Sequence, residues 1–188
     1  GSGDRPVATG ANAVAMGGGA VADGLGAVSI GAGNVATGDG AVAIGDPNVA
    51  TGRGAVALGA DNRAIGEGAV ALGADSFAEG DSAIALGRGA RAGAAGSVAI
   101  GAGAVASRAN QVSLGSSAST YTMAGIASDA SRAAQSGDVG FVTSDTAGNL
   151  AVTDFGPGDL AALDRQMRID RRDARAGIAA ATAMGYAP

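Results

Sequence analysis

The sequence predicts a mainly β protein, built as a parallel β-roll of short coils stacked on one another. A five-residue motif returns every 14 residues through the first two thirds of the chain. Within the motif, bulky apolar residues alternate with Ala or Ser, which is the periodicity of a β-strand. Glycine recurs at fixed places between the motifs, where the chain must turn.

The composition favours a thin, repetitive structure over an ordinary globular domain. The 188 residues include 35 Gly, and only 3% are aromatic, so large side chains for a thick core are scarce. The apolar fraction of 47% and the charged fraction of 15% argue against disorder.

The absence of His and Cys excludes most catalytic chemistry. A Ser-His-Asp triad, a Cys nucleophile and His or thiolate metal ligands are impossible. We therefore expect no enzyme, no cofactor, and no catalytic or metal-binding residue. The net charge of −5 argues against a nucleic-acid partner.

The repeat has a constant length with no insertion. Taking the first motif residue as position 1, the eight copies begin at Ala13, Ala27, Ala41, Ala55, Ala69, Ala83, Ser97 and Gln111. Position 5 is always Gly and position 10 is always Ala. Each unit therefore predicts a strand, a turn, a second strand and a turn, with successive coils about 4.8 Å apart.

The bulky residues at positions 2 and 4 are expected to point into the roll and to pack on the Ala of position 10. The predicted roll core is Val28, Ile30, Val42, Ile44, Val56, Leu58, Val70, Leu72, Ile84, Leu86, Val98 and Ile100. The Ala and Ser residues of positions 1 and 3 would then form an outer face that suits close approach by another chain. Because so thin a roll has little core of its own, self-association is expected.

The outward residues of the second strand, at positions 9 and 11, vary most along the repeat. Packing does not dictate them, so they are the natural place for ligand contact, although simple solvated stacking is the alternative. The candidate ligand-contact stripe consists of Val35, Val49, Arg63, Phe77, Arg91, Thr37, Thr51, Ile65 and Glu79.

The motif resembles the head repeat of the YadA-like trimeric autotransporter adhesins, whose signature is Asn-Ser-Val-Ala-Ile-Gly-x-x-Ser. Gly40-Ala-Val-Ala-Ile-Gly45 and Gly96-Ser-Val-Ala-Ile-Gly101 match it closely, and Asn110-Gln-Val-Ser-Leu-Gly-Ser116 is similar to the last head coil. The resemblance covers about residues 6–120. The residue before the motif is usually Gly here, where the family has Asn.

The resemblance implies a left-handed roll, a homotrimer, and exposure on the bacterial cell surface at the outer membrane. It also implies adhesion to host extracellular matrix or cells, or autoagglutination and biofilm formation. The partner would be a matrix protein or another host or bacterial surface ligand. The alternative is a different trimeric fibre, such as a phage tail fibre with a structural or receptor-binding role.

The repeat ends after Gly115, and the rest of the chain divides into three predicted parts. The head is expected at 4–115, and residues 1–3 are interpreted as a cloning scar. Residues 116–136 resemble a neck. Two alternating runs around a Gly-Asn turn predict a β-hairpin connector at 137–156.

Residues 157–188 predict a coiled-coil stalk running into the start of an anchor helix, with Asp159 as its N-cap. The predicted stalk interface, at a and d heptad positions, is Leu160, Leu163, Met167, Ala174 and Ala181, and Asp170 and Gly177 interrupt the d row. No stretch approaches 18 uninterrupted apolar residues, so membrane contact is expected only through a C-terminal anchor absent from this sequence.

Overall fold

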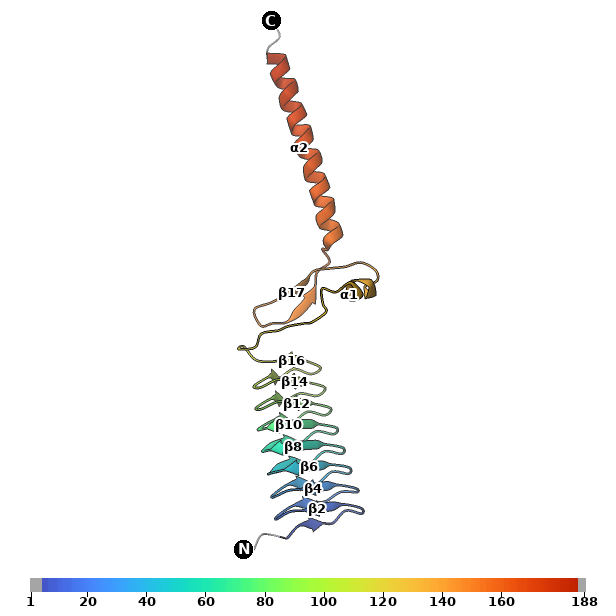
Figure 1. Ribbon diagram of the computed structural model, residues 1–188, viewed down its shortest axis with the longest axis vertical. Helices are drawn as coiled ribbons and strands as arrows, with labels where there is room; N and C mark the ends of the chain where they lie inside the picture. The colour runs from blue at the N-terminus through green and yellow to red at the C-terminus, as the bar shows by residue number, and fades with distance from the viewer. Residues whose placement is uncertain (1–4, 186–188) are drawn as a thin grey trace. The chain divides into compact units, whose positions relative to one another are not determined.

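The computed structural model describes residues 5–185, so the predicted cloning scar at 1–3 lies outside the described residues. The chain forms two compact units, Gly1–Thr120 and Tyr121–Pro188. The first unit is a parallel β-solenoid of about eight turns, as predicted (Figure 1). The second unit contains a short helix, a hairpin and a long C-terminal helix.

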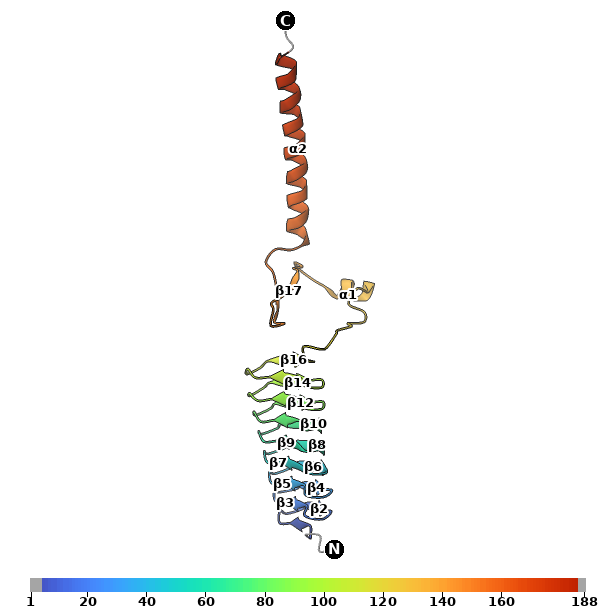
Figure 2. The same ribbon diagram turned by 90° about the vertical axis from the view of Figure 1, so that its left-hand side faces the viewer.

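The solenoid has two sheets of eight strands each, and the chain passes from one sheet to the other in every coil (Figure 2). The first sheet contains β1 (Val7–Ala8), β3 (Val21–Ala22), β5 (Val35–Ala36), β7 (Asn48–Ala50), β9 (Asn62–Ala64), β11 (Phe77–Ala78), β13 (Arg91–Ala92) and β15 (Val105–Ala106). The second contains β2 (Val14–Met16), β4 (Val28–Ile30), β6 (Val42–Gly45), β8 (Val56–Ala60), β10 (Val70–Ala74), β12 (Ile84–Leu86), β14 (Val98–Ile100) and β16 (Val112–Leu114).

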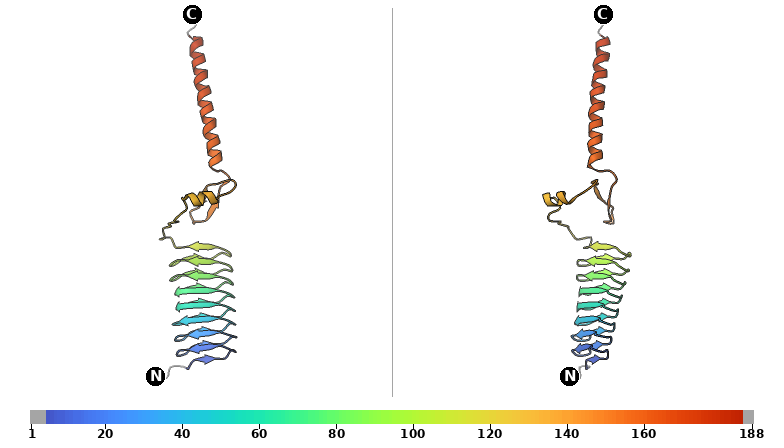
Figure 3. Two further views of the ribbon diagram at one scale, coloured as in Figure 1. Left: turned by 45° about the vertical axis from the view of Figure 1, so that its right-hand side comes forward. Right: turned by 90° about the vertical axis from the view of Figure 1, so that its right-hand side faces the viewer.

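The register of both sheets follows the sequence repeat. Every strand pairs in parallel with the equivalent residues of the next coil, as Val42 does with Val28 on one side and Val56 on the other. Equivalent residues therefore lie in register along the roll, and the strands of successive coils stack on one another (Figure 3). The 14-residue spacing alone sets this register.

The glycine at position 5 lets the chain leave the second sheet. Gly45 has a φ of 126°, which L side chains rarely adopt. A Cβ atom there would also overlap the carbonyl oxygen of Gly59 in the next coil. The invariance of Gly at this position therefore has a conformational cause and a steric cause.

The prediction of the roll core is wrong, because the opposite face of each second-sheet strand points inward. The fully buried side chains are those of positions 1, 3, 8 and 10, and every hydrophobic residue among them is Ala in the part of the chain described. Positions 2 and 4 point outward and stay half-buried or exposed: Val28, Ile30, Val42, Ile44, Val56, Leu58, Val70, Leu72, Ile84, Leu86, Val98 and Ile100. Leu58 retains 39% of its surface and Ile100 retains 38%.

The physical reason is the thickness of the roll. A 14-residue coil brings its two sheets so close that only methyl groups and small polar groups occupy the space between them, as the all-Ala core shows. Because successive side chains of a strand point to opposite faces, small residues inside put Val and Ile outside. The small-residue face expected at the surface is therefore the interior of the roll.

A ladder of buried Asn side chains lies inside the Ala core. Asn34, Asn48 and Asn62 occupy position 8 of three successive coils and are at most 1% exposed. Their amides donate to the side-chain oxygen of the preceding Asn and to backbone carbonyls of the turns. The Ser76 hydroxyl donates to the Asn62 side-chain oxygen and continues the ladder by one coil. Among the described residues, no buried side-chain nitrogen or oxygen lacks a partner.

The second unit begins with a helix that the sequence analysis did not predict, α1 (Asp129–Ala134), capped by the Ser128 side chain. A hairpin of β17 (Val142–Ser144) and β18 (Leu150–Val152) follows. In its turn, Asp145 accepts hydrogen bonds from the backbone of Ala147 and Asn149, both at 2.9 Å.

The last element is α2 (Pro157–Gly185), a helix of 29 residues with no buried side chain. The prediction that Asp159 is the N-cap is wrong, because Asp159 is the third residue of the helix. Its carboxylate accepts a hydrogen bond from the backbone N–H of Gly156, the residue before the helix, at 2.8 Å. Pro157 takes the first helical position, where the missing N–H costs nothing.

Candidate binding surfaces

The outward side of the second sheet carries a continuous apolar ladder. We use apolar ladder for the position 2 and position 4 residues of all eight coils: Val14, Met16, Val28, Ile30, Val42, Ile44, Val56, Leu58, Val70, Leu72, Ile84, Leu86, Val98, Ile100, Val112 and Leu114. In the middle coils these residues are half-buried or exposed. An apolar surface of this length indicates an interaction site.

The outward side of the first sheet carries the predicted ligand-contact stripe. Val35, Val49, Ile65 and Phe77 are half-buried, and Thr37, Thr51, Arg63, Glu79 and Arg91 are exposed. The position 9 residues of the stripe pair with their equivalents one coil away, and the position 11 residues follow directly after the strands. Whether they contact a ligand stays a prediction.

The stripe changes character in the middle of the roll. Its position 9 residues are Val in the coils before Arg63 and then become Arg63, Phe77 and Arg91. Phe77 pairs with Arg63 on one side and with Arg91 on the other. The Cζ atom of Arg91 lies 4.4 Å from the centre of the Phe77 ring, a cation–π contact.

The predicted stalk residues lie on α2 and are exposed. Leu160, Leu163 and Met167 retain 53%, 50% and 44% of their surface, and Ala174 and Ala181 are exposed as well. The helix thus presents an apolar row that nothing in one chain covers.

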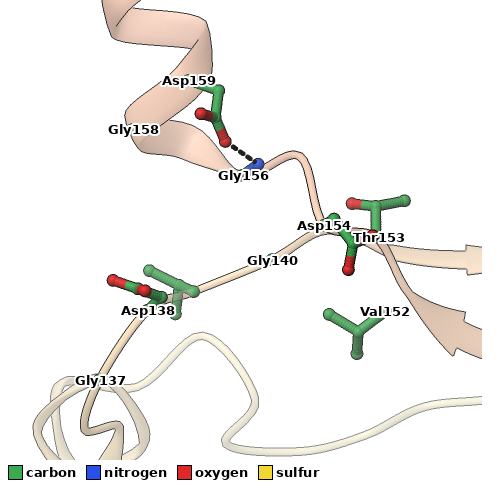
Figure 4. A pocket seen from close by; sticks show the side chains of 10 residues that line it. Gly137, Asp138, Gly140, Val152, Thr153, Asp154, Gly156, Gly158 and Asp159 are labelled. Carbon is green, nitrogen blue, oxygen red and sulfur yellow. Dashed lines mark hydrogen bonds between the residues drawn. The ribbon is translucent and has the colours of Figure 1, made fainter.

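A hollow of about 640 Å³ lies in the second unit, near the start of α2 (Figure 4). Asp138, Asp154 and Asp159 contribute carboxylates, and glycines form much of the wall. The Asp159 carboxylate is held by the Gly156 N–H. In the described part of the chain, no group of three or more acidic side chains is arranged to hold a metal ion.

No helix within residues 5–185 is long and apolar enough to cross a membrane. The sites that the structure does present are surfaces: the apolar ladder, the stripe on the first sheet and the apolar row of α2. Such surfaces support association with other molecules. The sequence showed that positions 2 and 4 recur as bulky apolar residues in all eight coils. It did not reveal that they lie on the surface of the roll.

Comparison with known families agrees with the roll. The family described as YadA head domain repeat (2 copies) matches residues 8–34, 36–62 and 64–90. No curated protein matches the chain. The three matched segments lie end to end on the coils of the first unit. Residues 8–90 therefore belong to the YadA head family, as the head region of a YadA-like trimeric autotransporter adhesin.

Proposed function

We propose that the chain is the adhesive passenger of a homotrimeric protein on the bacterial cell surface, with no enzymatic activity. It attaches the cell to host extracellular matrix, to host cells or to sister cells. The roll is the head, residues 116–136 are the neck, 137–156 the connector and 157–188 the stalk. Membership of the head family supports surface exposure and a trimeric, adhesive role.

The observation that carries this proposal is the apolar ladder. A single roll has an Ala core and leaves its Val, Ile and Leu side chains partly in water. Full burial of one such side chain contributes about 1.5–3 kcal/mol. Three rolls that turn their ladders toward a common axis would cover these residues and create the thick apolar core that one roll lacks.

The helix α2 supports the same assembly. Its apolar row, Leu160, Leu163, Met167, Ala174 and Ala181, would face the equivalent rows of two other chains in a parallel coiled coil. Charged residues are frequent on its other faces between Asp164 and Arg175, including an i,i+4 pair of Arg168 and Asp164 at 2.9 Å. Exposed ion pairs of this kind favour solubility more than stability.

The first sheet supplies the adhesive surface in this arrangement. When the ladders of the second sheet face the trimer axis, the stripe of positions 9 and 11 remains on the outside. Three copies of the stripe then lie around each head. Repeated sites on one particle raise the apparent affinity for a repetitive matrix ligand through avidity.

Adhesion is tested by offering the trimeric protein to a panel of immobilised collagen, fibronectin and cultured cells. We expect saturable binding to at least one surface, and clumping of beads that carry the protein. A variant with its assembly face disrupted, described below, serves as the monomeric control and should bind much more weakly. If the trimer neither binds any surface nor clumps beads, the adhesive proposal is wrong.

A further inference from the structure

One side of α2 carries a concentration of arginine. We call Arg165, Arg168, Arg171, Arg172 and Arg175 the arginine face; all five are exposed. The first, second, fourth and fifth members are spaced by three, four and three residues, so they lie on one side of the helix. The last four members line a shallow hollow of about 310 Å³, and no acidic residue lines it. The guanidinium groups are therefore gathered and accessible.

Aspartate neutralises only part of the arginine face. Asp164 pairs with Arg168 at 2.9 Å and Asp173 pairs with Arg172 at 3.2 Å, and all four side chains stay more than half exposed. Asp170, the third acid of this stretch, accepts a hydrogen bond from a glutamine one turn earlier at 2.8 Å. Three members of the face take part in no ion pair among the described residues: Arg165, Arg171 and Arg175.

The arginine face ends where an uncharged part of the helix begins. Residues 176–185, which we call the uncharged end, contain no acidic or basic side chain, and Ile178 and Met184 are exposed within it. At 1.5 Å per residue, the arginine face and the uncharged end are each about 15 Å long. A band of arginine followed by an uncharged segment is typical of a helix that meets a membrane surface, where the guanidinium groups stay among the lipid headgroups.

The arginine face does not compete with the apolar row of α2. In the heptad that places Leu160 and Met167 at a, Arg165 is an f residue and Arg168 is a b residue. These positions lie away from the seam of a coiled coil. Three helices joined through their apolar rows would therefore turn three arginine faces outward, around the stalk.

We propose that the arginine face binds the phosphate groups of lipids at the surface of the bacterial membrane on which the protein stands. The planar guanidinium suits phosphate, because it donates two parallel N–H bonds to two oxygens of one group. The chain as a whole carries a net charge of −5, so an anionic surface would repel it if its charge were evenly spread. Binding therefore depends on the local excess of arginine. The proposal rests on the proposed function, which places the chain at the cell surface.

The probes are vesicles of phosphatidylcholine alone and of phosphatidylcholine mixed with phosphatidylglycerol, and the readout is the partition coefficient of the intact protein in cosedimentation. We expect binding to the mixed vesicles that weakens as salt is added. One variant carrying Arg165→Gln, Arg171→Gln and Arg175→Gln should bind roughly a hundredfold more weakly, because each arginine near an anionic surface contributes about fivefold.

The matched control removes the same charge from exposed side chains of the roll: Arg63→Gln, Arg88→Gln and Arg91→Gln. It should bind the mixed vesicles as the unaltered protein does. Circular dichroism and light scattering of both variants show whether the helix and the assembly persist, and neither set of exposed changes should alter them.

Four results would overturn the proposal: equal binding to vesicles of phosphatidylcholine alone, equal loss in the roll control, complete displacement by inorganic phosphate at the lipid phosphate concentration, or tighter binding to double-stranded DNA. The first would assign membrane contact to the uncharged end, and the third would assign the face to free anions. Failure of vesicle binding with adhesion retained contradicts this proposal alone. Loss of adhesion with vesicle binding retained contradicts the proposed function instead.

Discussion

The side-chain amide of Asn48 donates a hydrogen bond to the side-chain oxygen of Asn34, one coil earlier, at 3.0 Å. The same Asn48 amide donates to the carbonyl oxygens of Ile44 at 3.0 Å and of Gly59 at 2.8 Å. Asn48 and Asn62 thus each tie their own coil to the coils before and after it. The largest fully buried side chains of the roll are therefore hydrogen-bonded amides and not apolar groups.

Replacing Asn48 by Ala should destabilise the roll by about 2–4 kcal/mol. The change removes the Asn48 side-chain oxygen that accepts from the Asn62 backbone N–H and side-chain amide. It also removes the bonds of the Asn48 amide to the carbonyls of Ile44 and Gly59 inside the core. Denaturant unfolding followed by circular dichroism measures the loss. Thr51→Ala, an exposed change in the same coil, is the control and should cost less than about 0.5 kcal/mol.

Replacing all three Asn residues by Ala should cost less than three times the single change. Ala90 and Ala104 occupy the same position in later coils, so a coil without the amide is compatible with the fold. A complete removal leaves fewer unpaired partners than a partial one. Strict additivity of the unfolding free energies would contradict the idea of one connected ladder.

Gly45→Ala and Gly40→Ala form a matched pair that separates steric clash from backbone conformation. Both glycines have positive φ, 126° at Gly45 and 66° at Gly40. A Cβ at Gly40 meets nothing within 4 Å, so that change should cost about 1–2 kcal/mol. Gly45→Ala should cost clearly more, because its Cβ overlaps the Gly59 carbonyl. Equal unfolding midpoints would show that the coils are not so tightly stacked.

Leu163→Asp should lower the helical signal of the intact protein and its resistance to heating. The 29-residue helix has no buried side chain in one chain, so its stability depends on covering its apolar row. Arg165→Gln, an exposed change outside that row, should have little effect. If circular dichroism shows equal helicity in both variants, α2 does not rely on partners.

The sequence predicted the coil, its register and the turn glycines because the 14-residue repeat encodes them directly. It did not reveal which face of the strand points inward. Alternation such as Val42, Ala43, Ile44 defines two faces, and large apolar residues are usually the buried ones. Here the two sheets lie too close together for such side chains, and the distance between sheets is a tertiary property.

Other differences have local causes. The recurrence of Asn at positions 34, 48 and 62 was visible in the sequence, but a polar ladder was not expected in an apolar core. The six residues of α1 carry no apolar periodicity and depend on the Ser128 cap, which receives a hydrogen bond from the Ser131 N–H at 3.1 Å. The contact between Arg91 and Phe77 could be recognised only once the register of the sheet was known.

Substitutions at two neighbouring residues distinguish the inward face of the strand from the outward face. Ala57 is fully buried, so Ala57→Leu should overpack the interior and destabilise the roll by about 1–3 kcal/mol or more. Val56 points outward from the same strand, and Val56→Asp should leave the β-signal of the roll in place. Loss of the β-signal in Val56→Asp together with its retention in Ala57→Leu would mean that Val56 faces inward.

The most direct measurement is the molar mass in solution, by light scattering, of the unaltered protein and of a Val56→Asp, Leu58→Asp variant. These two changes place charges on the apolar ladder without touching the Ala interior. We expect three chains per particle for the unaltered protein, and monomers with retained β-structure for the variant. A stable monomer of the unaltered protein at micromolar concentration, or an unchanged trimer of the variant, would contradict assembly through the ladder.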